Sequence, residues 1–535
     1  MAVSKVMNNL IGSSRRAKYP AVMGSELSVN MYYAKNGQNE YMESLPGLQF
    51  LSNVGGRCRG AYVSTVGLSA THSPEDMFAV MGNALYRFDV YGNKTRLGAV
   101  ASNGRRVSFA ETGGPRALLL IADGSNLFYY DLLEGGDLKP IQLPERITEQ
   151  GGLISPTHVA VVAGSIVVND AGSGYVYYSK PYPLNSDKRK MYQMDGANVV
   201  YKDDGVTPDT EEVDSDRHVF EDDYGAQQYF NSESSSDSIN AIYAVNGLLY
   251  VYGPKSCEVW QRGSSEFEDW IRVSYTAQSS FGLEAPGSIA SCGNTLYFIA
   301  SGQQYGKCIM AAVGTQFKKI SEDWLDEKLL QESTESAYAY CYSVGEHQFY
   351  VLQLNSIGET WAYDVLDGGW HQRVSRDSTS GAEIQWRVGG IAYFAEKFFA
   401  FTNDGCVCGF HRDHWYEDFS ESERLPMIRH RQTAVITDGL KPFTFEELAV
   451  ECNVGTWDDY TQRPQMLLEV SKDGGNTFGN VRSASLGRTG DYSHRVRWLG
   501  LGLNRLCVIR VTYSHPTDLV LTACSIRAEA TGAMI

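Results

Sequence analysis

Two cysteines and two histidines that lie close together in the sequence form the set most able to bind a metal. Cys406 and Cys408 are followed by His411 and His414, and all four side chains are of types that ligate zinc. A tetrahedral zinc site usually has wider gaps between its cysteines and a longer loop before its histidines. Because the spacing here departs from that pattern, we expect no metal and no other cofactor.

Two further segments resemble functional motifs but lack residues that the chemistry of those motifs requires. Gly302 to Cys308 is one residue short of a phosphate loop and ends in Cys instead of a magnesium-binding Ser or Thr. His411-Arg412-Asp413 is similar to a kinase catalytic loop, but Asp418 stands where the metal-binding Asn belongs. The chain contains neither Gly-x-Ser-x-Gly nor His-Glu-x-x-His. We therefore predict no catalytic residues and no enzymatic activity.

A loop near the C-terminus matches Ser-x-Asp-x-Gly-x-Thr-aromatic, the Asp-box pattern of sialidases and other propellers. Its residues are Ser471, Asp473, Gly475, Thr477 and Phe478. Such a loop closes a β-hairpin, because the glycine accepts unusual dihedral angles, the aspartate accepts backbone N–H groups and the aromatic ring anchors the loop. The single copy predicts a structural hairpin and says little about catalysis.

The charges of the chain are unevenly distributed. The net charge of −17 comes from 63 acidic and 46 basic residues, and it argues against a protein that binds nucleic acid over its whole surface. Asp203 to Asp223 holds ten acids and one base, whereas Arg482 to Arg510 holds six arginines, no lysine and one acid. The candidate interface or channel charges are Asp203, Asp204, Glu211, Glu212, Arg482, Arg488, Arg495 and Arg497.

Each charged segment also has a purely structural interpretation. A block of like charges is typical of a solvated loop or extension, and an exposed basic strand face is the simplest explanation for any single arginine. Paired carboxylates hydrolyse glycosides only where the fold fixes their separation. We expect Asp203 to Asp223 to be flexible and therefore to lack a fixed separation.

Short apolar runs rich in tyrosine alternate with turns that contain Gly or Asn. The 535 residues include 33 Tyr and 53 Gly, and flat aromatic side chains favour strands. Asn-Gly and Asp-Gly turns predict hairpins because both residues accept a positive φ. The predicted hairpins join 78–81 to 84–88, 118–122 to 127–130, 242–245 to 248–252, 288–291 to 295–300, 339–343 to 347–354, and 391–394 to 398–401.

The hairpin unit, often followed by a third strand such as Glu258 to Gln261, recurs about every 45 residues, which is typical of propeller blades. A set of stacked antiparallel sheets is the alternative. Glu322 to Glu335 has helical spacing of its apolar residues, and several strands follow residue 431. The predicted fold is all-β: a β-propeller-like body with one short helix, and a C-terminal β-sandwich-like domain.

The same pattern gives the domain boundaries. We predict an N-terminal arm or docking segment over 1–55, a β-propeller-like body over 56–430 with a polar acidic insertion over 182–240, and a C-terminal β domain over 431–535. Ten cysteines without paired spacing favour a reducing compartment. No segment approaches the roughly 20 apolar residues of a membrane helix, and no signal-peptide block is evident, so we expect synthesis in a cytoplasm.

Three parts of the sequence, taken together, are similar to one protein family. They comprise Glu26 to Tyr32 with Leu45 to Leu48 and Arg59 to Tyr62; Gly282 to Ile289 through Phe317 to Ser321; and Leu468 to Phe478 with Ala484 to Arg488, Gly490 to Tyr492 and Arg495 to Trp498. Together they resemble the tail-hub proteins of short-tailed bacteriophages, also called nozzle, tail accessory or packaged-DNA stabilisation proteins. The acidic segment after Pro181 has no counterpart in that resemblance.

The resemblance implies a virion structural protein that forms a ring, expected to be a hexamer, below the portal and its head-to-tail adaptor. The ring would extend the channel for genomic DNA, which passes without specific binding, and would help to retain packaged DNA. It would also dock a tailspike or tail fibre and a central needle or plug. The expected location is the virion tail, after assembly in the host cytoplasm.

Two alternatives come from other classes of function. The Asp box and the aromatic-rich sheets are also compatible with a sialidase-like or other carbohydrate-active propeller enzyme, or with a glycan-binding tail protein. The enzyme would need an arginine cluster and a carboxylate that converge on one face of the propeller. In the tail hub, the acidic segment would either line the channel or meet the arginines of a neighbouring copy.

Overall fold

The computed structural model describes residues 3–7, 10–15, 26–64, 76–114, 116–147, 151–232, 238–265, 268–273, 281–302, 306–438, 441–455, 457 and 463–530. The chain divides into two compact units. Unit 1 comprises residues 1–50, 321–387 and 408–535, and unit 2 comprises residues 51–320 and 388–407.

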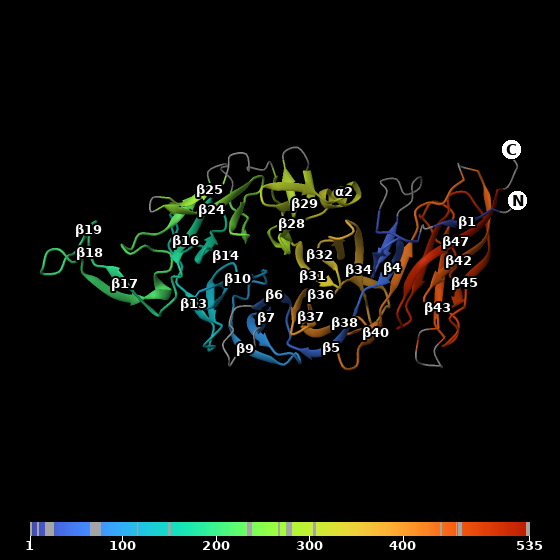
Figure 1. Ribbon diagram of the computed structural model, residues 1–535, viewed down its shortest axis with the longest axis horizontal. Helices are drawn as coiled ribbons and strands as arrows, with labels where there is room; N and C mark the ends of the chain where they lie inside the picture. The colour runs from blue at the N-terminus through green and yellow to red at the C-terminus, as the bar shows by residue number, and fades with distance from the viewer. Residues whose placement is uncertain are drawn as a thin grey trace. The chain divides into compact units, whose positions relative to one another are not determined.

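Unit 2 is a series of antiparallel sheets that follow one another along the chain (Figure 1). The first two sheets are β6 (Cys58–Ser64), β7 (Asp76–Met81), β8 (Ala84–Phe88) and β9 (Lys94–Ala99), and then β10 (Ser108–Thr112), β11 (Leu118–Ala122), β12 (Leu127–Asp131) and β13 (Lys139–Ile141). The next two are β14 (Val159–Val162), β15 (Ser165–Asn169), β16 (Tyr175–Pro181) and β21 (Tyr229–Asn231), and then β22 (Ala241–Val245), β23 (Leu248–Tyr252), β24 (Cys257–Ser265) and β25 (Glu268–Arg272). The fifth sheet is β26 (Phe281–Leu283), β28 (Thr295–Gly302), β29 (Gly306–Val313) and β30 (Gln316–Lys319), with β27 (Ala290–Cys292) paired to β28. Strands β36 (Val388–Phe394) and β37 (Lys397–Thr402) also belong to unit 2.

Tight turns join these strands where the sequence predicts them. β22 and β23 are joined by Asn246 and Gly247, which have φ values of 52° and 75°, as the hairpin turn requires. One predicted strand starts later than expected. The strand predicted from Ser288 begins at Ala290 and pairs with β28 as predicted, because Pro286–Ser288 forms a 3-10 turn in which the Ser288 hydroxyl donates to the carbonyl of Ala285 (2.7 Å).

Each inner strand of unit 2 sends alternate side chains into two different cores. On β7, Phe78 and Val80 pack with β11 residues such as Leu119, whereas Met77 and Ala79 pack in a second cluster with residues of β36 and β37. Side chains alternate across a strand, so both faces of the sheet are buried. Sheets packed face to face in chain order are the arrangement of propeller blades, and it explains why these strands are continuously apolar.

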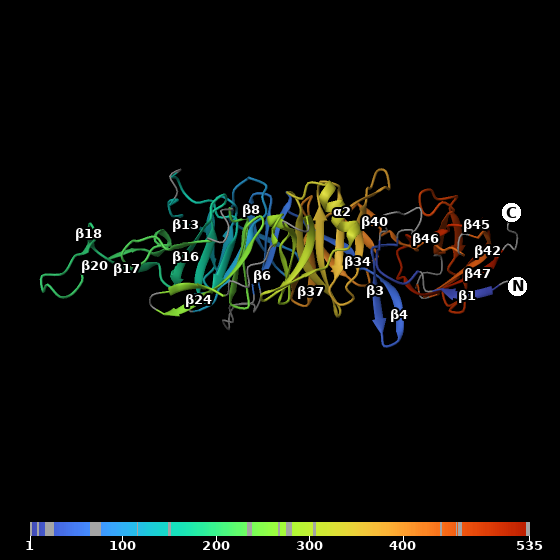
Figure 2. The same cartoon turned by 90° about the horizontal axis from the view of Figure 1, so that it is seen from above.

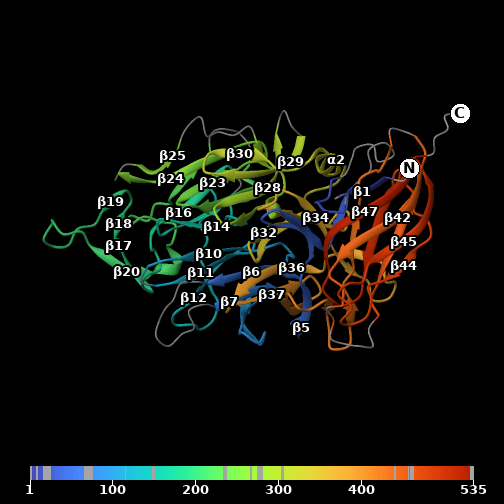
Figure 3. The same ribbon diagram turned by 45° about the vertical axis from the view of Figure 1, so that its right-hand side comes forward.

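Unit 1 contains a β-sandwich. One sheet has the order β3 (Met31–Asn36), β4 (Asn39–Ser44), β47 (Val520–Ala530), β42 (Phe443–Cys452), β45 (Val496–Asn504), with β1 (Val3–Met7) on β47; the other includes β2 (Leu27–Val29), β41 (Arg429–Gln432), β46 (Val508–Tyr513), β43 (Gln465–Ser471) and β44 (Arg482–Ser485). Figure 3 shows β42, β45 and β47 side by side, and Figure 2 shows the β3–β4 hairpin projecting from its sheet. A single apolar cluster lies between the sheets, with Met466, Leu448 and Ile509 at its centre.

Unit 1 also holds one more four-stranded meander, whose last strand pairs with β2. It consists of β31 (Tyr338–Val344), β32 (His347–Leu354), β33 (Glu359–Asp364) and β34 (Trp370–Arg376), with β35 (Glu383–Gln385) on β34. Further strands are β5 (Gly47–Asn53), β38 (Cys406–His411), β39 (Tyr416–Asp418) and β40 (Arg424–Pro426), and β39 pairs with β40. The predicted helix is present as α2 (Asp323–Gln331), which buries Trp324, Leu325 and Leu329.

The predicted all-β class, with propeller sheets and a C-terminal sandwich, is confirmed. The domain boundaries stay predictions.

Among the described residues, no helix has the length and apolar character needed to cross a membrane. Eight cysteines are in the thiol form, and most of them are buried. Cys292 and Cys341 differ from the expectation of reduced cysteines, because each is disulfide-bonded.

Candidate interaction surfaces

The acidic segment folds as a β extension of unit 2. β17 (Lys188–Tyr192) pairs with β20 (Thr210–Asp214), and β18 (Met194–Asp195) pairs with β19 (Asn198–Val199). We call residues 182–228 the acidic extension; it leaves its sheet after β16, returns at β21 and reaches beyond that sheet (Figures 1 and 2). The expectation that Asp203 to Asp223 is flexible is therefore wrong, because strand pairing fixes its backbone.

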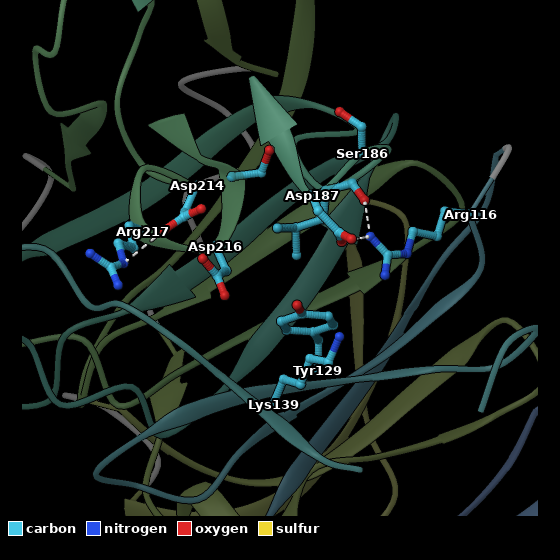
Figure 4. A pocket seen from close by; sticks show the side chains of 10 residues that line it. Arg116, Tyr129, Lys139, Ser186, Asp187, Asp214, Asp216 and Arg217 are labelled. Atoms are coloured by element: carbon cyan, nitrogen blue, oxygen red, sulfur yellow. Dashed lines mark hydrogen bonds and ion pairs between the residues drawn. The ribbon is translucent and has the colours of Figure 1, made fainter. Parts of the chain in front are cut away.

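The base of the acidic extension is anchored at a pocket of about 330 Å³ (Figure 4). Arg116 reaches across this pocket, with Nε 2.7 Å from Asp131 Oδ2 and Nη1 2.9 Å from Asp187 Oδ1. Burial opposes the ionisation of Asp131, but hydrogen bonds from the N–H of Glu134 and from Arg116 outweigh it and lower its pKa. Arg217 pairs with Asp214 on the opposite wall (3.4 Å). Both arginines of the pocket thus pair with its carboxylates, which makes it an anchor.

A second anchor lies around Asp223. Its carboxylate is 2.7 Å from Lys180 Nζ and 2.9 Å from Arg189 Nη2, and Arg189 Nη1 also donates to the carbonyl of His218 (2.9 Å). The two cations overcome the effect of burial and lower the pKa of Asp223. Of the ten acids in Asp203 to Asp223, those at the end of the segment therefore hold the extension in place.

The far part of the extension carries the unpaired charge. We call residues 190–212 the acidic tip; it contains six acids and two lysines. Asp203, Glu211 and Glu212 are exposed and form no ion pair with a described residue, although Lys190 lies opposite Glu212 in the strand register. Asp204 is also exposed, but hydrogen bonds from the hydroxyl and N–H of Thr207 lower its pKa to about 2.

The arginines of the C-terminal strip lie on the outside of the sandwich. We call residues 481–505 the arginine face; it holds five arginines and one acid. Arg482, Arg488, Arg495, Arg497 and Arg505 are all exposed and form no ion pair with a described residue. Arg510, which the sequence places in the same strip, is a different case, because its guanidinium lies 3.8 Å from the centre of the Phe478 ring and donates to Gln432.

Arg482 is the only one of these five whose guanidinium makes a described hydrogen bond. It donates to the carbonyls of Leu499 (2.7 Å) and Gly500 (3.1 Å), which lie on β45, the end strand of its sheet. The indole of Trp498 donates to the carbonyl of Arg482 in return (3.2 Å). Arg482 therefore covers part of the open edge of β45 and links the two sheets of the sandwich.

The Asp-box residues form a tightly hydrogen-bonded loop after β43. The Ser471 hydroxyl donates to Asp473 Oδ1 (2.7 Å) and accepts the N–H of Gly475 (2.8 Å). Asp473 accepts the N–H of Thr477 (2.9 Å) and its hydroxyl (2.6 Å). Hydrogen bonds from Ser471 and Thr477 hold the pKa of Asp473 well below its usual range. Every one of these polar groups has a structural partner within the loop.

The cysteine and histidine set does not converge. Cys408 and Cys406 are buried, and His414 Nε2 lies 3.1 Å from Asp418 Oδ2 instead of facing a cysteine. Across the part of the chain that the structure describes, no group of three or more His, Cys, Asp or Glu side chains is placed to hold a metal.

Sequence reasoning missed the apolar residues of both charged surfaces. Leu499 and Leu503 are 54% and 55% exposed on the arginine face, and Tyr201 and Val206 are 53% and 78% exposed on the acidic tip. Alternation along β45 gives a signal for Leu499, because Arg497 precedes it by two residues. The exposed positions on the tip lie in turns, where no such period applies.

A series of blade-like sheets joined to a β-sandwich defines the class as propeller–sandwich proteins. A family model described as the β-propeller of bacteriophage P22 Gp10 matches residues 12–404, and one described as its β-sandwich matches residues 428–529. The chain therefore belongs to the Gp10 family of tail hub or nozzle proteins, as its sequence resemblance predicts, and is a bacteriophage tail structural protein.

Comparison with individual proteins adds no further argument. No curated protein matches the chain. Among solved structures, virginiamycin B lyase from Staphylococcus aureus is 10% identical, with a TM-score of 0.38, over 68% of this chain and 97% of the lyase. YCF48 from Cyanidioschyzon merolae is 12% identical, with a TM-score of 0.35, over 68% of this chain and 99% of that protein. Scores this low support no functional argument.

Proposed function

We propose that copies of this chain form a closed ring, a hexamer, that is the tail hub below the portal and its head-to-tail adaptor. The observation that carries the proposal is the family membership, which spans residues 12–404 and 428–529. A hub of this kind extends the DNA channel, helps to retain the packaged genome, and docks tailspikes or fibres and a central needle or plug. It is assembled in the host cytoplasm and acts in the virion.

The charge of the chain supports a passage that DNA crosses without binding. Six copies of a chain with net charge −17 carry about −102. A field of that sign repels phosphates from the wall of a channel. Retention of the genome then depends on the parts that close the channel, and the hub contributes by holding them.

The protein acts by assembly and not by catalysis. A sialidase-like enzyme would bring an arginine cluster and a carboxylate together on the propeller, whereas the arginines of the arginine face lie on the sandwich and the Asp-box groups bond to each other. Those observations favour the tail hub over the carbohydrate-active alternative.

The test is to assemble phage particles with and without this protein. With it, heads should keep nuclease-protected DNA and carry their receptor-binding appendages. Without it, heads should fill, lose their DNA and lack the appendages. Particles that keep both in its absence would contradict the proposal.

A further inference from the structure

The arginine face of the sandwich is a surface built for a carboxylate-bearing partner. All five of its basic residues are arginine, with no lysine, and a guanidinium binds a carboxylate through two parallel hydrogen bonds. Within the described residues no carboxylate pairs with Arg488, Arg495, Arg497 or Arg505. Acidic Glu447 lies opposite Leu499 in the strand register.

The same face also exposes apolar side chains. Leu499 and Leu503 are more than half exposed on β45, and Tyr492 is 73% exposed in the loop before it. A surface that combines exposed apolar side chains with arginines has the make-up of a protein interface, where a polar, solvent-accessible rim surrounds an apolar core from which water is excluded.

The acidic tip of unit 2 has the complementary make-up. Its six acids and two lysines give a net charge of −4, and the arginine face, with five arginines and one aspartate, has +4. Val206 and Tyr201 are exposed beside Asp203, so the tip also combines apolar side chains with unpaired charge. β17–β20 pairing and the anchors at its base hold it in an ordered conformation, which lowers the entropy lost on binding.

We propose that the acidic tip of one copy binds the arginine face of the next copy, and that this contact joins the subunits of the ring. The inference rests on the proposed ring. Two different patches on one chain make a head-to-tail contact, which closes into a ring when repeated around an axis, whereas a patch paired with itself gives a two-fold dimer. Here self-pairing would oppose like charges.

The contact should be sensitive to salt. Ion pairs at exposed sites contribute up to about 1 kcal/mol each, and the screening length falls from about 8 Å at 0.15 M salt to about 3 Å at 1 M. Raising the salt concentration should therefore increase the fraction of free subunits. Contacts of the apolar residues should preserve part of the affinity between subunits.

The test is charge reversal on each side, followed by combination. Arg495→Glu with Arg497→Glu should raise the protein concentration at half-assembly at least tenfold, measured by mass photometry and native mass spectrometry. Glu211→Arg with Glu212→Arg should do the same. The four changes combined should return this concentration to within about threefold of the wild type, because the two surfaces are then complementary again.

Matched controls reverse two exposed charges elsewhere. Lys318→Glu with Lys397→Glu, and Glu134→Arg with Asp137→Arg, should leave assembly unchanged. Far-UV circular dichroism and urea unfolding show whether each variant folds. Should a reversal fail to fold, the milder Arg497→Gln and Glu211→Gln are used instead, and each should raise the concentration at half-assembly about threefold.

The outcomes separate this inference from the proposed ring. Rings that persist in both reversal variants would overturn the contact and leave the ring standing. Intact rings of the Glu211→Arg, Glu212→Arg variant that now bind double-stranded DNA would place the tip at the channel and overturn the contact. Wild-type protein that forms no ring, alone or with portal complexes, would overturn both proposals. Rescue by the combined changes would support both.

Discussion

Two groups of arginines in unit 1 differ in burial and in hydrogen bonding. Arg429 on β41 is fully buried; its Nη1 donates to the carbonyl of Thr517 (2.7 Å) and its Nη2 to that of His515. Arg431 is equally buried and donates to the carbonyl of Leu10 (3.2 Å). Arg495 and Arg497 on the arginine face are exposed and have no such partners.

This difference separates the arginines that stabilise the fold, which are buried, from those that are available to a binding partner, which are exposed. A buried guanidinium is stabilised by the hydrogen bonds that it makes, and the bonds to backbone carbonyls make Arg429 and Arg431 fixed parts of unit 1. Burial lowers the pKa of Arg429 to about 10, and the group still carries its charge at neutral pH. An exposed arginine adds little to folding, and its presence points to a function outside the subunit.

The largest expected effect comes from removing a buried arginine. Arg429→Ala removes the donor to the carbonyl of Thr517, leaves the carbonyl of His515 with the N–H of Thr517 alone, and opens a cavity, so the free energy of unfolding should fall by about 3 kcal/mol. Urea denaturation monitored by tryptophan fluorescence measures it. A loss below about 1 kcal/mol would break the distinction between the two groups of arginines.

A second prediction concerns pH and the buried carboxyl of Glu417. Burial raises its pKa from 4.5 to about 7, and the charge of Arg373 and the hydroxyl of Ser375 (3.2 Å) only partly oppose this. Between those values the folded protein binds the proton and the unfolded chain does not. Stability should therefore fall as the pH rises from about 4.5 to 7, by about 3 kcal/mol in total, and then level off.

The matched variant for this prediction is Glu417→Gln, which keeps the size of the side chain and removes its titration. In urea denaturation from pH 4 to 8, the free energy of unfolding of this variant should fall by about 3 kcal/mol less than that of the wild type. Glu423→Gln, at a partly exposed ion pair with Arg387, should leave the dependence in place. An unchanged slope in Glu417→Gln would show that another group is responsible.

A smaller effect is expected at the Asp-box loop. Ser471 is fully buried, and Ser471→Ala removes the acceptor of the Gly475 N–H and the donor to Asp473. The cost should be about 1–2 kcal/mol in the free energy of unfolding, with exposed Ser483→Ala as the neutral control. Equal values for both variants would contradict a structural role for this loop.

The smallest effect is expected on the arginine face itself. Arg497→Ala should change the free energy of unfolding by less than about 0.5 kcal/mol, because the side chain is exposed and makes no described hydrogen bond. The same urea titration measures it beside Arg429→Ala. A loss above 1 kcal/mol would make Arg497 a structural residue and remove the contrast.

Local signals predicted much of the fold. The Asn246-Gly247 turn and the alternation around β22 and β23 depend on neighbouring residues, and the helix at Trp324 follows from apolar spacing. Pairing of β4 with β47, where Met42 lies opposite Leu521, joins strands hundreds of residues apart and leaves no local pattern. The N-terminal strands of the sandwich could therefore not be predicted.

Charge patterns predicted the two charged segments but not which of their charges are paired within the subunit. A count of acids in Asp203 to Asp223 gives Asp223 and Glu211 equal weight. In the structure, Asp223 is held by Lys180 and Arg189, whereas Glu211 is exposed. Likewise Arg510 belongs to the strip in sequence but packs on Phe478. Which charges are paired depends on tertiary contacts that no spacing rule contains.

The central claim is that this chain works by assembling into a ring. Negative-stain electron microscopy of the purified protein, alone and mixed with portal complexes, tests it most directly. The account predicts closed rings, six-fold by class averaging, that dock coaxially on the portal complexes. Particles that stay monomeric and bind no portal complex would contradict it.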